Sequence, residues 1–263
     1  MKGTPYTRLI VEVTEEWLDA FGVRRKPDWG ADLLLMHYFN FRLKYISYEP
    51  WVIHWSRELK SALPLHPMRL AIAQIAIEAS VGMDVNCYQS KEVFNADRDD
   101  DLLNDWHIHH LHLSTEVDPV NPRFMKRSDQ LLFVCFKSPN AYLIDTATHR
   151  NPGWGRKRLL EIMVDNWPDV MRPLQSGWTI SPDLSDGEVE LLRKRGYMCG
   201  VNIRGKGYVL PGFGYTSSGD NMVAISMANE VWRWGEANRE LFARDRRLFV
   251  QQLKVRLGMA SQP

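Results

Sequence analysis

Histidines are concentrated in one short segment of the chain. Four of the eight lie within six residues, at His107, His109, His110 and His112. The segment alternates as a strand does, which predicts that His107 and His109 share one face while His110 and His112 share the other. Each pair can supply two ligands to zinc or manganese, with His149 or an aspartate as a third. No HExxH or Cys/His pattern accompanies them, so histidines that only stabilise a half-buried strand are the alternative.

A strongly basic stretch follows the histidines. Residues 123–158 hold eight Lys or Arg against two Asp, a net charge of +6 within 36 residues, although the whole chain carries only +1. Arg127 precedes one predicted strand, and His149 and Arg150 follow the next, so a hairpin would bring the three together. Arginine and histidine side chains that converge in this way suit a phosphodiester and its pentavalent transition state. A solvated basic surface is the alternative.

Three predicted strands position these residues. The first is the histidine segment, and the next two are 129–137 and 141–147, joined by Ser-Pro-Asn, which is turn chemistry. A helix over 156–166 follows, and its end coincides with Trp167-Pro168. This part of the chain therefore predicts a small antiparallel sheet with a hairpin.

The sequence predicts that the regions on both sides of the sheet are mainly helical. Before the sheet we expect a strand over 8–13, a helix capped by Thr14, and helices over 32–46 and 67–82. After it, Ser185 and Glu188 have capping-box spacing. A strand over 222–227 and one long helix over 228–257 would end the chain.

Together these elements predict an α+β protein with a helical N-terminal region, a small antiparallel sheet with a hairpin, and a mixed C-terminal region ending in a long helix. Its expected segments are a helical scaffold over 1–104, the sheet and its candidate site over 105–170, and an α+β region over 171–263.

Composition narrows the class of protein. With 263 residues, 44% hydrophobic and 25% charged, the chain can bury a real core. Three widely spaced cysteines (Cys87, Cys135 and Cys199) predict free thiols rather than a disulfide framework. The first residues lack the apolar stretch and cleavage site typical of a secretory signal, and no apolar run reaches the roughly 18 residues that a membrane span needs. We therefore expect a cytoplasmic protein with no membrane partner.

Residues 105–150 resemble the RelE/HigB-like bacterial toxins, which are ribosome-dependent ribonucleases of toxin–antitoxin modules. The resemblance rests on His110–Leu113, where the family has its "hxELR" strand, on Arg127–Phe133, and on Tyr142–Arg150, which ends as the family's "GHRK"-like strand does. The whole chain is also similar to uncharacterised bacterial proteins of mobile or defence loci. The toxin resemblance implies RNA, the ribosome and a cognate antitoxin as partners.

The same resemblance implies roles for single residues. Arg127 would stabilise the phosphate, His149 and Arg150 would match the terminal basic pair, and His112 occupies a position where the family often has an arginine. Imidazoles transfer protons near neutral pH, so His112 and His149 are the acid/base candidates.

Three functions are consistent with the sequence. The leading hypothesis is a toxin or defence ribonuclease that cleaves RNA without a metal or other cofactor, with His112, Arg127, His149 and Arg150 as its catalytic residues. The first alternative is a non-enzymatic component that binds protein or nucleic acid. The second is a metallohydrolase that holds zinc or manganese at His107, His109, His110 and His112.

Overall fold

The computed structural model describes residues 3–26, 28–98, 100–149, 156–211, 214–216 and 220–259, with backbone alone at Arg156. The chain is α+β, as predicted. It divides into two compact units, and each is assembled from separate stretches of sequence. Unit 1 comprises Met1–Ser47, Glu92–Asp99 and Asp220–Pro263, and unit 2 comprises Tyr48–Lys91 and Asp100–Gly219. This division cuts across the three successive segments expected from the sequence.

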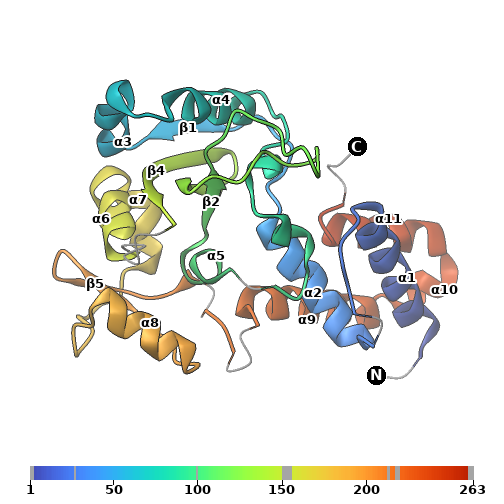
Figure 1. Cartoon of the computed structure of the whole chain (residues 1–263). Helices are drawn as coiled ribbons and strands as arrows, with labels where there is room; N and C mark the ends of the chain where they lie inside the picture. Colours follow the sequence, from blue (N-terminus) through green and yellow to red (C-terminus); the bar gives the residue numbers. More distant parts are fainter. Residues whose placement is uncertain are drawn as a thin grey trace. The chain divides into compact units, whose positions relative to one another are not determined.

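Unit 1 is helical in its described residues. Its helices are α1 (Pro5–Ala20), α2 (Ala31–Lys44), α9 (Met222–Ala237), α10 (Arg239–Arg244) and α11 (Arg246–Arg256). Helix α2 packs against both α1 and α9, so the two ends of the chain share one core (Figure 1). Gly235 of α9 allows the approach to α1, because a Cβ atom there would lie 2.8 Å from Cδ1 of Ile10.

The expected strand over 8–13 is wrong, because these residues lie inside α1. The helix begins well before the expected cap at Thr14, with Thr4 as its N-cap and Pro5 in its first turn. Thr14 is not a cap; it is buried, and its hydroxyl donates to the carbonyl of Ile10 at 2.7 Å. Packing of the apolar face of α1 has overridden the local preference of β-branched residues for strands.

The C-terminal expectations also need correction. Residues 222–227 form the first turns of α9 rather than a strand, and the side chain of Asn221 caps them by accepting from Val223 N at 2.8 Å. The single long helix is instead three helices. Asp245 leaves helical geometry, with φ −147° and ψ 85°, and its carboxylate caps α11 by accepting from Leu248 N.

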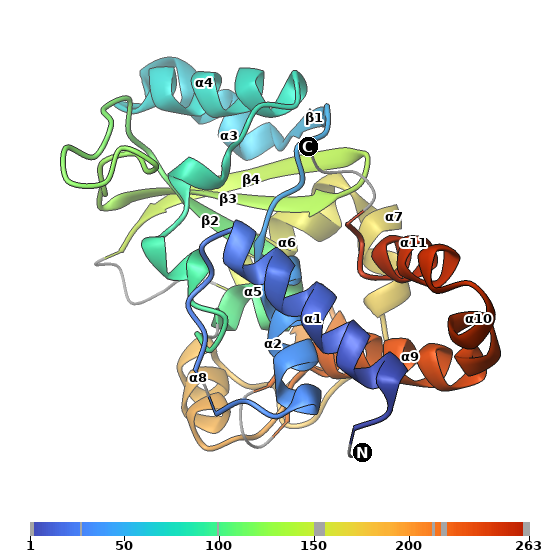
Figure 2. The ribbon, with the colours of Figure 1, turned by 90° about the vertical axis from the view of Figure 1, so that its right-hand side faces the viewer.

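Unit 2 is built on a four-stranded mixed sheet in the order β1-β4-β3-β2 (Figure 2). The strands are β1 (Val52–Trp55), β2 (Ile108–His112), β3 (Gln130–Lys137) and β4 (Asn140–Thr148). The predicted antiparallel arrangement of the last three is confirmed, and β3 and β4 form the predicted hairpin. Strand β1 was not predicted, and it pairs parallel to β4.

Helices cover both faces of the sheet (Figure 2). On one face lie α3 (Arg57–Ala62) and α4 (Arg69–Ser80), and on the other lies α6 (Arg156–Asn166). The remaining elements of unit 2 are α5, α7, α8 and the hairpin β5–β6. Their bounds are α5 Asp101–Trp106, α7 Pro168–Met171, α8 Asp186–Lys194, β5 Val201–Ile203 and β6 Lys206–Tyr208. Short 3-10 turns lie at Leu63–Leu65, Asn86–Tyr88, Lys91–Phe94 and Arg172–Leu174.

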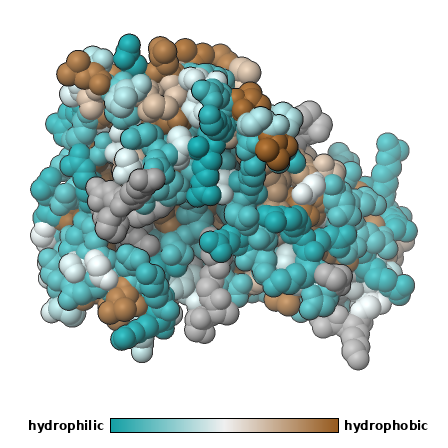
Figure 3. Space-filling view, in the orientation of Figure 1, coloured by the Kyte–Doolittle hydropathy of each residue, from teal (hydrophilic) through white to brown (hydrophobic). Residues whose placement is uncertain are grey.

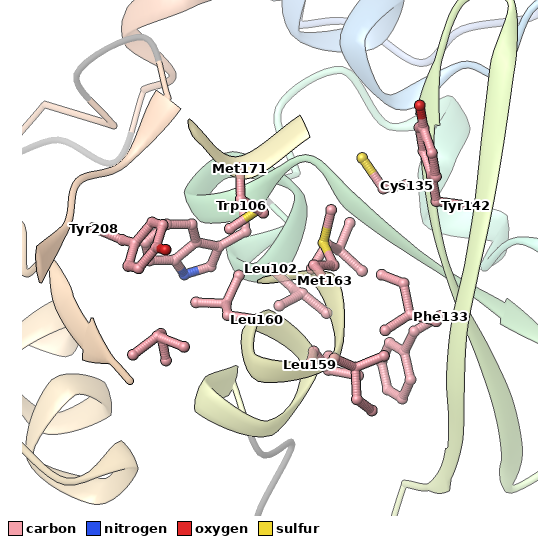
Figure 4. Close-up of a cluster of buried hydrophobic side chains, with 14 of the residues drawn as sticks. Leu102, Trp106, Phe133, Cys135, Tyr142, Leu159, Leu160, Met163, Met171 and Tyr208 are labelled. Atoms are coloured by element: carbon pink, nitrogen blue, oxygen red, sulfur yellow. The ribbon is translucent and has the colours of Figure 1, made fainter. Parts of the chain in front are cut away.

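The core of unit 2 lies on the α6 side of the sheet. Trp106 of α5, Phe133 of β3 and Leu160 of α6 meet there, with Tyr208 of β6 closing the far side (Figure 4). The predicted capping box of α8 is present, with both Ser185 and Glu188 engaged. This core fixes the position of α5, and with it the start of the histidine strand.

Apolar side chains are also exposed on α4. Leu70, Ile77 and Val81 lie on one side of this helix and its end, and all are exposed; brown side chains gather over α3 and α4 in Figure 3. Among the described residues, no helix has both the length and the apolar composition to cross a bilayer.

Candidate active site

Three histidine rings meet at one end of the sheet in unit 2. His110 and His112 share a face of β2, and His149 follows β4. The ring centroids of His112 and His149 are 5.3 Å apart, and that of His110 lies 6.4 Å from His112 and 6.3 Å from His149. Strand β3 lies between β2 and β4, so the hairpin register brings these residues together.

His112 has a defined tautomer. Its Nδ1 lies 2.9 Å from the carbonyl oxygen of Ser128, and since a carbonyl only accepts, Nδ1 carries the hydrogen. In the neutral ring Nε2 then has the lone pair, and this atom is buried with no hydrogen-bond partner among the described residues. The side chain is 2% exposed, and this burial lowers the pKa of His112 to about 4. His112 is therefore a neutral proton acceptor at pH 7.

His149 is the more accessible ring of this pair, being half-buried. Its backbone N–H donates to the carbonyl of Asp129 at 2.9 Å, which fixes it beside the start of β3. Burial is the main cause that lowers the pKa of His149, and the positive charge of Arg127 lowers it further. Both effects favour the neutral form of His149.

Arg127 lies three residues before β3, at the end of the sheet where His149 bonds the backbone of Asp129, as the hairpin predicted. Its charge lowers the pKa of His112 as well as that of His149. The side chain is exposed and makes no hydrogen bond or ion pair with any described residue, so its guanidinium is available to an anion. Arg150, the fourth predicted catalytic residue, lies outside the described residues.

The sequence did not single out Asp100 as a site residue. One oxygen of its carboxylate accepts from Leu103 N at 3.1 Å and so caps α5, and the other lies 3.3 Å from Nδ1 of His110. The acidic run just before the histidines was the only sequence signal for this contact. The contact between Asp100 and His110 depends on the left-handed turn at His107, where α5 ends and the chain enters β2.

The four histidines proposed as metal ligands do not form one group. His107 is not in the strand; it is the left-handed C-cap of α5, with φ 56° and ψ 33°. His109 faces away from His110 and His112 and makes an edge contact with Phe136, 5.4 Å between ring centroids. Within the part of the chain that the structure describes, no three His, Cys, Asp or Glu side chains are arranged to hold a metal ion.

Much of the predicted basic patch is neutralised locally. Lys126 pairs with Glu116 at 2.9 Å, and Arg158 of α6 pairs with Asp145 of β4 at 3.0 Å. Lys157 lies 2.9 Å from Asp183. Arg127 contrasts with these pairs, because it forms no ion pair with a described carboxylate and its charge lowers the pKa of both His112 and His149.

Comparisons of the chain with protein-family models, with curated proteins and with solved structures found no match.

Proposed function

We propose that the protein is a ribonuclease of the toxin or defence type that cleaves RNA by acid/base chemistry without a metal. One observation carries the proposal: two neutral histidine rings, His112 and His149, lie 5.3 Å apart beside the exposed, unpaired Arg127. Proton acceptors next to a free guanidinium are what the cleavage of a phosphodiester by a neighbouring hydroxyl requires.

In the proposed reaction, His149 takes the proton from a ribose 2′-hydroxyl, because it is the more accessible of the two rings. The 2′-oxygen then bonds to the adjacent phosphorus, and the bond from phosphorus to the 5′-oxygen breaks. Arg127 offsets the charge that develops on the phosphoryl oxygens. The step releases one proton, and His112, next to His149, is the alternative acceptor for it. The products are a 2′,3′-cyclic phosphate and a 5′-hydroxyl.

The test is cleavage of an end-labelled RNA, and of DNA of the same sequence, in EDTA, with and without ribosomes. We expect cleavage of the RNA alone, with cyclic phosphate ends, and a rate reduced about 100-fold or more in His149→Gln. Two matched controls should cleave as the wild type does. His54→Gln replaces a half-buried histidine of β1 that bonds Asn140, and Lys126→Ala removes the cation next to Arg127.

Three outcomes would contradict the proposal. Cleavage that EDTA abolishes would require a metal. Cleavage that is unchanged in His149→Gln would place the chemistry elsewhere. RNA binding without cleavage, in the presence or absence of ribosomes, would favour the non-enzymatic component. Isolation of the protein in a complex with ribosomes or with a cognate antitoxin would identify that partner.

A further inference from the structure

The proposed reaction needs a proton donor as well as a proton acceptor. The leaving 5′-oxygen has to be protonated as its bond to phosphorus breaks, since an alkoxide is a poor leaving group. Burial lowers the pKa of both His112 and His149, which favours their neutral, proton-accepting forms. The donor is therefore a different group.

His110 is the third ring of the site and the one with a carboxylate partner. Its Nδ1 lies 3.3 Å from Oδ2 of Asp100, and its ring centroid is about equally far from His112 and His149. Both members of the pair are sheltered, with side chains 17% and 25% exposed, so bulk water screens their interaction only in part. A carboxylate oxygen this close to Nδ1 holds the imidazole ring in one orientation, so Nε2 is the ring nitrogen that exchanges a proton with the substrate.

The carboxylate of Asp100 is itself held in place. Its Oδ1 accepts from Leu103 N as the N-cap of α5, which leaves Oδ2 for His110. Helix α5 in turn is anchored by Leu102 and Trp106 in the core of unit 2. Asp100 is thus fixed by the fold beside the histidine strand rather than carried on a free loop.

We propose that His110, oriented by Asp100, is the general acid that protonates the 5′-oxygen of the RNA leaving group. This inference rests on the proposed function of the same site. In the completed step, one proton leaves the 2′-hydroxyl for His149 and one passes from His110 to the 5′-oxygen. The phosphorus gains a bond to the 2′-oxygen and loses its bond to the 5′-oxygen. His110 is then a catalytic residue and Asp100 a positioning residue.

A substrate whose leaving group needs no proton tests this assignment. Uridine 3′-(4-nitrophenyl phosphate) cyclises in the same way, but it releases 4-nitrophenolate, which is stable as an anion. We expect His110→Gln to cleave RNA about 100-fold or more slowly than wild type while cleaving this ester at about the wild-type rate. His149→Gln should be slow on both substrates, because both need the base.

A second variant separates catalysis from folding. Asparagine caps helices as well as aspartate does, so Asp100→Asn keeps the bond to Leu103 N but removes the charge beside His110. We expect Asp100→Asn to lose rate on RNA and to retain it on the nitrophenyl ester.

The results separate two failures. Wild-type protein that cleaves neither substrate overturns the proposed function, and this inference with it. Wild-type protein that cleaves both, with His110→Gln equally active on RNA or equally impaired on both substrates, overturns the role of His110 alone.

Discussion

His109 should make the protein less stable in acid, and the size of the effect follows from its burial. The side chain is 6% exposed, and this burial lowers its pKa from 6.5 to about 4. Below pH 6.5 the unfolded chain therefore binds a proton at His109 that the folded chain excludes. The stabilisation from the neutral folded form is complete above pH 6.5 and is lost as the pH falls towards 4.

Linkage converts that shift into a free energy. A group with pKa 6.5 when unfolded and about 4 when folded lowers the free energy of unfolding by about 2–3 kcal/mol between pH 7.5 and pH 4.5. Replacing His109 by leucine, which has a similar volume, removes this contribution. Urea unfolding of His109→Leu should therefore lose about 2–3 kcal/mol less than wild type over the same pH change.

The control is Val134→Ala, the cross-strand partner of His109 in β3. This substitution creates a cavity without changing any titratable group. The unfolding free energy of Val134→Ala should therefore be lower than that of wild type by a similar amount at pH 7.5 and at pH 4.5. If His109→Leu and wild type lose the same free energy between pH 7.5 and pH 4.5, burial does not keep His109 neutral and the reasoning is refuted.

Three further predictions concern other contacts of unit 2. Arg193→Leu removes the Nε–H that donates to both carboxylate oxygens of Asp105, whose side chain is 4% exposed. In urea unfolding, this variant should lose about 3–5 kcal/mol of unfolding free energy, because a buried carboxylate is left without its cation. The double variant Arg193→Leu/Asp105→Leu should recover most of that loss, and no recovery would contradict the pairing. Arg127→Ala removes a charge that lowers the pKa of His149, so the acidic limb of kcat/KM should move to higher pH, and an unmoved limb would argue against their proximity. Ser56→Ala loses the cap of α3 and a bond to β4, a cost of about 2–3 kcal/mol in urea unfolding that an exposed Ser138→Ala control should not show.

The hairpin was predictable because its information is local. Short apolar runs on both sides of Ser-Pro-Asn specify two strands and a tight turn, and the register then places Arg127 and His149 at one end. His110 and His112 were likewise assigned to one face by the period of a strand. These residues do converge, although Arg150 lies outside the described residues.

Strand β1 and helix α1 were not predictable in the same way. Val52–Trp55 is only four residues long, and it is a strand because a parallel neighbour, β4, lies beside it. The Leu-Ile-Val run of α1 favours a strand locally, and only its packing on α2 makes it helical. The contact of Asp100 with His110 was equally unpredictable from the sequence, because it depends on the left-handed turn at His107.

The sequence by itself determined the α+β class, the hairpin, the neighbourhood of Arg127 and His149, and the common face of His110 and His112, because each follows from spacing along a short segment. Only the tertiary structure decided which histidines are buried and that His107 and His109 lie apart from the other two. It also decided that the carboxylate of Asp100 lies next to His110. Burial and ion pairing depend on residues far apart in the chain, and the pKa of an imidazole follows from those surroundings rather than from its neighbours in sequence.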